Sequence, residues 1–134
     1  MKYLLDTDIC IYLINGDKTL ISKVKDTGVF SIGISNVTLA ELYYGAYLSE
    51  YVESNISNII EFRKNLTVYS DNSDSAEAFG LIKSTLKQSG KIIEDFDILI
   101  ASIAIANDCV LVTNNIRHFQ RIPNLEIENW LETK

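Results

Sequence analysis

Acidic residues follow the first apolar, strand-like segment of the chain, a position from which side chains can do chemistry. In YLLDTDICIYLI, residues 3–14, Asp6 and Asp8 follow a buried strand-like run, and apolar residues then resume at once. An unpaired carboxylate is costly to bury. These acids therefore either cap the helix that follows or face a cleft in which they hold something positive.

A third acid lies within a predicted helix. In the helix that begins with NVTLAELYYGA at residue 36, helical spacing places Glu41 on an apolar face with Val37, Ala40, Tyr44 and Leu48. A glutamate on such a face needs a partner. Either a nearby lysine or arginine pairs with it, or its side chain reaches water, or it shares a ligand with other acids.

The segment EDFDILIASIAIAND, residues 94–108, joins acids to a helix that is apolar almost all round. Nearly every position from Asp97 to Ala106 is apolar, which predicts a buried helix. Asp97 lies in the first turn, where the helix dipole favours a carboxylate. Glu94 and Asp95 are interpreted as exposed first-turn acids, whereas Asp97 either caps the helix or belongs to a site.

Together, Asp6, Glu41 and Asp97 predict a common site, because each lies where a core-facing element meets the end of a strand. Asn115, in the TNN segment after CVLV, faces the same crevice if its strand neighbours the first one. Converging carboxylates repel each other, and a divalent cation neutralises them. Oxygen ligands suit Mg²⁺ or Mn²⁺, and such an ion promotes hydrolysis of a phosphodiester.

The composition is that of an ordinary globular protein. The chain has 134 residues, 47% of them hydrophobic and 22% charged, and its length predicts one domain over 1–134. It has no apolar run long enough for a membrane span, and its start turns acidic too quickly for a signal peptide, so we expect a cytoplasmic protein. The net charge of −6 argues against a broadly basic nucleic-acid binder, but not against an enzyme with clustered carboxylates.

Strand-like and helical segments alternate along the whole chain. Strands are predicted at 2–5, 29–35, 66–70, 109–113 and 125–129, and helices at 7–15, 18–26, 37–48, 50–65, 73–90 and 95–107. Thr7 or Asp8 is the predicted cap of the first helix. Short apolar strands that alternate with helices are typical of a parallel sheet covered on both faces. The sequence therefore predicts an α/β three-layer sandwich.

Three segments of the chain resemble a known family. YLLDTDICIYLI, ISNVTLAELYYGA and DFDILIASIAIANDCVLVTNNIRHFQRIPNLEIENW are similar to the PIN-domain ribonucleases, specifically to the VapC-type toxins of bacterial toxin–antitoxin pairs. The likeness extends from Met1 to about Trp130 and rests on the order and spacing of the acid after the first strand, AEL, DxLIA and TNN. It implies a PIN-like fold with a central parallel sheet of about five strands.

The resemblance also implies roles for individual residues. Asp6, Glu41 and Asp97 would be the metal-binding carboxylates, and Asn115 would occupy a fourth catalytic position that is often aspartate in the family. Because Asn115 is an amide, one firmly bound Mg²⁺ or Mn²⁺ is implied, and a second would arrive with substrate phosphate. Thr113 would bond the neighbouring carboxylates or a water at the metal.

The activity implied by the resemblance is that of a metal-dependent endoribonuclease, the toxin of a type II toxin–antitoxin system. The closing FxRIPNLEIENW further resembles a subgroup that cuts initiator tRNA in the anticodon region. The implied partners are therefore RNA, a second copy of the chain in a homodimer, and an antitoxin that often sends an arginine or lysine into the acidic pocket. Thr113, Arg117 and Arg121 are the expected substrate contacts, at the mouth of the site.

Several interpretations stay open beside this one. Lys83 and Lys87 are either RNA contacts or a solvated helix face, and His118, the only histidine, is either structural or a general base. The LLDTD segment also resembles the DxD of phosphoaspartate phosphatases, although that chemistry needs a lysine such as Lys83. A third hypothesis is a catalytically weak PIN module that only binds a partner, and Asn115 is its only support.

Overall fold

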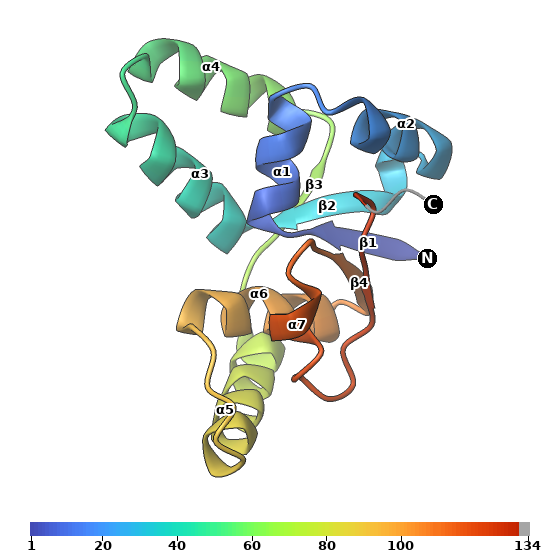
Figure 1. Ribbon diagram of the computed structural model, residues 1–134, viewed down its shortest axis with the longest axis vertical. Coiled ribbons are helices and arrows are strands. Elements are labelled where there is room, and N and C mark those ends of the chain that lie inside the picture. Colours follow the sequence, from blue (N-terminus) through green and yellow to red (C-terminus); the bar gives the residue numbers. More distant parts are fainter. Residues whose placement is uncertain (132–134) are drawn as a thin grey trace.

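The computed structural model describes residues 1–131, in which a five-stranded sheet is covered by helices on both faces (Figure 1). The strands are β1 (Lys2–Leu5), β2 (Ile32–Ser35), β3 (Thr67–Tyr69), β4 (Cys109–Val112) and β5 (Ile127–Glu128). All are parallel, in the order β3-β2-β1-β4-β5. The predicted α/β sandwich with a central parallel sheet of about five strands is confirmed.

The helices form two layers, one on each face of the sheet. One layer holds α1 (Thr7–Ile14), α2 (Lys18–Thr27), α3 (Asn36–Leu48) and α4 (Val52–Arg63), and the other holds α5 (Ser73–Gln88), α6 (Asp95–Ala106) and α7 (Ile116–Phe119). Successive strand residues point to opposite faces, so Leu4 packs with α5–α7 and Leu5 with α1–α4. Both are fully buried, which explains why β1 is apolar without alternation. No helix within 1–131 is long and apolar enough to cross a membrane.

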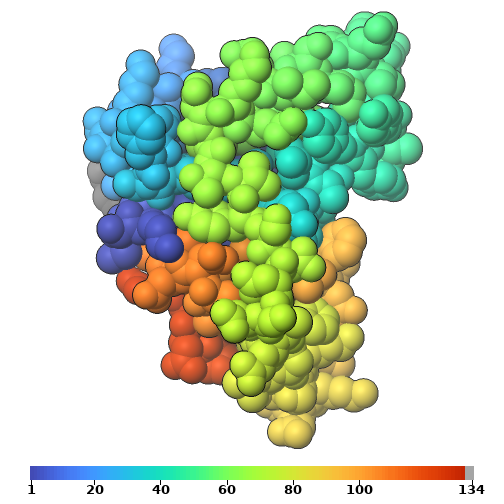
Figure 2. All heavy atoms as spheres, turned by 180° about the vertical axis from the view of Figure 1, so that it is seen from behind, coloured from blue at the N-terminus to red at the C-terminus, as the bar shows by residue number. Residues whose placement is uncertain are grey.

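Helices α3 and α4 pack against each other and project from the sheet as an arm (Figure 1). Seen from behind, α4, β3 and α5 form a continuous band across the face of the molecule, and α3 projects to one side of this band (Figure 2). The acid-bearing end of α3 stays at the sheet, because Ser35, the last residue of β2, caps α3 by accepting from the N–H of Thr38 at 3.0 Å.

The segment predicted as a strand over 29–35 is divided in the structure. Val29–Ser31 form a 3₁₀ turn, and only Ile32–Ser35 form β2. Residues Tyr3–Leu5 of β1 pair with Ile32–Ile34, so 29–31 lie outside the paired part of the sheet. Gly33 allows β2 to approach β3 closely, since a Cβ there would lie 2.5 Å from the Tyr69 ring.

The predicted apolar face of α3 is wrong. The buried face consists of Thr38, Leu42 and Ala46, whereas Tyr44 and Leu48 are 68% and 70% exposed. Helix α3 packs on α1 and α4, and this contact turns the predicted stripe toward solvent. Glu41 lies at the border of the two faces and is half-buried.

Candidate carboxylate site

The sheet order reverses at β1, which marks the expected ligand crevice. The chain passes from β1 to β2 on one side, while β4 lies on the other, and ligands of such sheets bind outside the carboxyl ends of the strands at this switch point. Leu5 and Val112 are partners in the register, and the N–H of Asp6 donates to the carbonyl of Val112 at 2.9 Å. The backbone therefore fixes Asp6 beside Thr113.

Asp6 is held by two further hydrogen bonds. Its Oδ1 accepts from the N–H of Thr7 at 2.8 Å, so Asp6 itself caps α1 in place of the predicted Thr7 or Asp8. Its Oδ2 accepts from the hydroxyl of Thr113 at 2.8 Å. Thr113 is fully buried, and its hydroxyl supports the carboxylate as the resemblance implied. The substrate contact that was also expected of Thr113 stays a prediction.

Glu41 is joined to Asp6 through Thr7. The Thr7 hydroxyl donates to Oε1 of Glu41 at 2.6 Å and lies 3.1 Å from the hydroxyl oxygen of buried Thr38. A hydroxyl has one proton, so Thr7 accepts from Thr38 while it donates to Glu41. Sequence reasoning considered Thr7 only as a helix cap. Its place between two candidate acids depends on the approach of α3 to α1, which no local pattern encodes.

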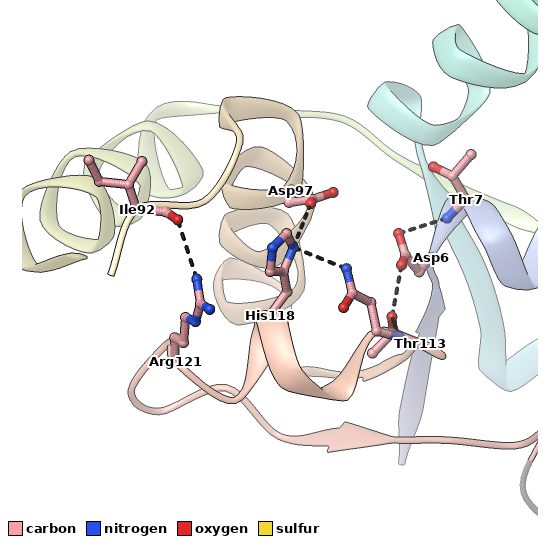
Figure 3. A network of polar contacts seen from close by, with 8 residues as sticks. Asp6, Thr7, Ile92, Asp97, Thr113, His118 and Arg121 are labelled. Atoms are coloured by element: carbon pink, nitrogen blue, oxygen red, sulfur yellow. Dashed lines mark hydrogen bonds and ion pairs between the residues drawn. The ribbon is translucent and has the colours of Figure 1, made fainter. Parts of the chain in front are cut away.

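Asp97 lies at the opposite end of the network from Thr7, and contacts connect it to Asp6 (Figure 3). Nδ1 of His118 lies 3.6 Å from Oδ2 of Asp97 and 3.0 Å from Nδ2 of Asn115. A protonated Nδ1 donates to Asp97, whereas a bare Nδ1 accepts from the Asn115 amide. The N–H of Asn115 donates to the hydroxyl oxygen of Thr113 at 2.9 Å. These contacts form a polar network between Asp97 and Asp6, in which Nδ1 of His118 makes one of its two contacts at a time.

Lysine and arginine side chains do not neutralise these acids in the part of the chain that the structure describes. Within residues 1–131 no lysine or arginine forms an ion pair with Asp6, Glu41 or Asp97. Asp95, two residues before Asp97, is instead exposed and lies 2.9 Å from Nζ of Lys83. Asp95 therefore belongs to the surface, as predicted, and Lys83 is engaged away from the network.

Asp6 has the most perturbed carboxyl group of the three. Burial raises its pKa from 3.8 to about 6, although the hydrogen bonds from Thr113 and Thr7 act to lower it. Repulsion from Asp97 and Asp8 raises the pKa further. Asp8 is exposed, so its charge raises the pKa of Asp6 from outside the hydrogen-bonded network.

The other two acids are perturbed in the same direction. Burial raises the pKa of Glu41 against the Thr7 hydrogen bond, and repulsion from Asp97, Asp8 and Glu94 adds to it. Burial also raises the pKa of Asp97, which His118 lowers and Glu94 raises. Because Asp97 raises the pKa of both Glu41 and Asp6, the three carboxylates share one electrostatic environment.

The oxygen donors suit a hard divalent cation, but they do not form a closed cluster. In the described part of the chain, no three Asp, Glu, His or Cys side chains lie close enough to hold one ion as they stand. Asp6 is fixed by its hydrogen bonds, whereas Glu41 and Asp97 are half-exposed. The donor chemistry fits Mg²⁺ or Mn²⁺, and completing the site requires the two outer side chains to turn toward Asp6.

The two arginines that were expected to contact substrate lie on helix α7 (Arg117) and two residues after its end (Arg121). Arg117 is exposed beside His118, and Nη1 of Arg121 donates to the carbonyl of Ile92 at 3.3 Å (Figure 3). Sequence analysis did not predict α7, because its 4 residues are too few for a periodic pattern. Along the chain, Arg117 and Arg121 stand before and after His118, the histidine that faces Asp97.

Comparisons with known proteins agree with this architecture. The PIN domain family model matches residues 3–125. Ribonuclease VapC2 of Haemophilus influenzae is 41% identical over 131 residues, which cover 98% of this chain and 99% of the relative. The tRNA(fMet)-specific endonuclease VapC of Shigella flexneri is 34% identical over 130 residues, which cover 97% of this chain and 98% of that relative. The crystal structure of VapBC2 from Rickettsia felis bound to a promoter DNA fragment contains a chain that is 40% identical, with a TM-score of 0.92 and coverage of 97% and 99%.

Proposed function

Because this chain belongs to the PIN domain family and, within it, to the VapC ribonucleases, we propose that it is a divalent-metal-dependent endoribonuclease and the toxin of a type II toxin–antitoxin pair. The observation that carries the metal dependence is the set of three carboxylates with raised pKa values at the β1/β4 switch point, unpaired with any lysine or arginine within 1–131. We place its activity in the cytoplasm, where its RNA substrate is found.

The substrate that we propose is initiator tRNA, cut in the anticodon region. Support comes from the Shigella flexneri relative, whose name specifies tRNA(fMet) and which matches nearly the full chain. The closing segment that carries the sequence resemblance, 119–130, begins with the last residue of α7 and includes all of β5. The segment follows His118, whose ring faces Asp97, so we place it next to the position of the reacting phosphate.

Asp6, Glu41 and Asp97 would hold one Mg²⁺ or Mn²⁺, with the amide oxygen of Asn115 at the fourth catalytic position. When bound, the ion supplies a Lewis acid for the phosphate and lowers the pKa of the attacking water. Thr113 fixes Asp6 by its hydrogen bond at 2.8 Å, so the central ligand is positioned before the ion arrives. Arg117 and Arg121 bind phosphate of the RNA, since Arg117 precedes the histidine that faces Asp97 and Arg121 follows two residues after the end of α7.

An antitoxin and a second copy of the chain are the proposed protein partners. A groove of about 220 Å³ opens between α1, α3 and α4, and its residues are Ile11, Ile14, Asn15, Glu41, Leu42, Gly45, Ala46, Asn55, Asn58 and Ile59. Nearby on the arm, Tyr44, Tyr47 and Tyr51 are 67–69% exposed, and exposed apolar surface of this kind is typical of protein interfaces. A partner segment in the groove reaches Glu41, where its lysine or arginine would compete with the metal.

The phosphoaspartate phosphatase alternative lacks its lysine. Lys83, the residue that it requires near Asp6, pairs with Asp95 at 2.9 Å. Within residues 1–131, Asp6 accepts its side-chain hydrogen bonds from Thr7 and Thr113. These contacts favour the nuclease.

Removing divalent metal is expected to stop RNA cleavage. We expect the purified protein, freed of any antitoxin, to cut an initiator tRNA transcript in Mg²⁺ or Mn²⁺ and to be inactive in EDTA, because the three acids then repel the phosphate. Mapping the ends of the products locates the cut, and readdition of Mn²⁺ controls for irreversible loss. Cleavage that continues unchanged in EDTA would refute metal dependence, and no cleavage in either ion would support the weak-module alternative.

Thr7 is expected to position Glu41 for catalysis. Replacing Thr7 with valine removes the 2.6 Å hydrogen bond but keeps the shape of the side chain. By analogy with other residues that orient metal ligands, kcat should fall roughly 10-fold or more with little change in KM. Thr7→Ser keeps the hydroxyl and should restore most of the activity. If serine and valine behave alike, the hydroxyl has no positioning role.

A further inference from the structure

A hollow lined by basic side chains lies between α7 and the connection from α5 to α6. It has a volume of about 670 Å³ and is lined by Gly90, Lys91, Ile92, Arg117, Gln120 and Arg121. Three of these residues are basic and none is acidic. In a chain of net charge −6, such a local concentration of positive charge favours an anionic ligand.

The wall that carries Lys91 is held rigidly by the end of α5. Gly90 has a φ of 71°, its N–H donates to the Lys87 carbonyl at 3.2 Å, and the N–H of Lys91 donates to the Leu86 carbonyl at 2.9 Å. This is the Schellman arrangement that closes helix C-termini. Beyond Lys91, Ile93 is buried in the core. The backbone of Lys91 is therefore fixed from both sides.

The opposite wall is tied to this one. Arg121 donates from Nη1 to the Ile92 carbonyl at 3.3 Å, which joins α7 to the connection between α5 and α6. A guanidinium has five N–H donors, so this single contact leaves Arg121 with donors for a ligand. The hollow is thus a prearranged surface between two elements.

The positive charges of the hollow are not neutralised by protein groups. In the described residues no carboxylate forms an ion pair with Lys91, Arg117 or Arg121, whereas Lys83 pairs with Asp95 at 2.9 Å and Lys64 with Glu61 at 3.2 Å. Lys91 and Arg117 are exposed to solvent. Cations that are unpaired and hydrated contribute to binding a polyanion by releasing its counterions.

The hollow adjoins the reacting centre through one short helix. Arg117 immediately precedes His118, whose ring faces Asp97, and Arg121 follows at the end of α7 (Figure 3). An RNA strand with its scissile phosphate at the carboxylates meets strong negative charge there. Cations beside that centre offset the repulsion for the neighbouring phosphates.

We propose that this hollow binds the backbone phosphates next to the scissile bond, and that Lys91 is an RNA-binding residue of the enzyme together with Arg117 and Arg121. The inference rests on the proposed function, since it assigns a binding surface to the same substrate. RNA fits better than an acidic protein segment, because the hollow is wide and carries three cations, whereas the narrower, mostly apolar groove that suits a protein segment lies between α1, α3 and α4.

The test compares Lys91→Gln with Lys25→Gln, a matched control. Lys25 is exposed in the last turn of α2, on the opposite face of the sheet from α7. Binding of a fluorescein-labelled anticodon stem-loop RNA is followed by anisotropy in EDTA over a series of salt concentrations, and a gel confirms that the RNA stays intact. For Lys91→Gln we expect roughly 3- to 10-fold weaker binding near 0.1 M salt and a salt slope smaller by about 0.7 to 0.9. Lys25→Gln should match the wild type.

Two outcomes would overturn the inference. One is that Lys91→Gln binds the RNA with wild-type affinity and salt slope. This outcome counts against the inference even if the same variant binds the antitoxin less well. The other is an equal loss in Lys25→Gln, which would indicate a general effect of net charge. Neither depends on catalysis. Failure of the proposed function is detected separately, as a wild-type protein that binds RNA but cuts none in Mg²⁺ or Mn²⁺.

Discussion

Asp6→Asn should lower the rate of RNA cleavage by roughly 10³-fold or more, because metal-assisted charge stabilisation is worth several kcal/mol. Asp6 is the most buried of the three acids and the one fixed by hydrogen bonds from both Thr7 and Thr113. Asparagine has nearly the same shape and retains polar atoms for these contacts, so the fold should persist. The measurement is kcat/KM on labelled initiator tRNA in Mg²⁺, with circular dichroism as the check on folding.

The first turn of α6 supplies a matched pair of controls for the same experiment. Asp97 faces His118 in the network, whereas Asp95 is paired with Lys83 at the surface. We therefore expect Asp97→Asn to lose cleavage as Asp6→Asn does, and Asp95→Asn to cleave like the wild type. An active Asp97→Asn protein would remove Asp97 from the catalytic set. An inactive Asp95→Asn protein would show that the site has been assigned to the wrong acids.

Much of the fold is predictable because the strands of this sheet are buried on both faces. Segments such as YLL and CVLV are apolar without alternation, and in a parallel sheet this pattern leaves few alternatives. The end of α5 at Gly90 is equally local, since that residue adopts a φ of 71°. The acid after β1 is visible for the same reason, because a carboxylate contrasts with the apolar strand before it.

What the sequence could not provide depends on contacts between distant elements. Glu41 was found through an apolar face that proved wrong, since α3 packs through Leu42 and Ala46 instead. The link from Glu41 through Thr7 joins α3 to α1, and the contact of His118 with Asp97 joins α7 to α6. Neither link has a local signature. That the three acids hold one ion therefore stays a prediction. The cleavage experiments test it by asking whether the acids act together.

The metal-free protein should become less stable as the pH rises from about 4 to about 7, and Asp6 is the main cause. Its pKa is about 6 in the folded chain and 3.8 in the reference state. A raised folded-state pKa contributes stability that is fully present below 3.8 and is lost as the pH rises through 6. The difference corresponds to roughly 3 kcal/mol. The raised pKa values of Glu41 and Asp97 act in the same direction.

Urea unfolding in EDTA, performed on the wild type and on Asp6→Asn, separates this contribution from the titrating groups that do not interact with Asp6. Asparagine carries no charge at either pH, so the free energy of unfolding of the variant relative to the wild type should rise by roughly 2 kcal/mol between about pH 4 and pH 7, since part of the full difference is already lost at pH 4. Mg²⁺ or Mn²⁺ at neutral pH should then stabilise the wild type and not the variant, because an ion that binds only the folded state shifts the equilibrium toward it. A difference that does not change with pH would mean that Asp6 is not destabilised by burial. Burial destabilises the charged Asp6 carboxylate in the empty site, and a bound cation relieves that cost, so Asp6 should be a strong ligand. Stabilisation of both proteins by the ion would therefore place the cation elsewhere.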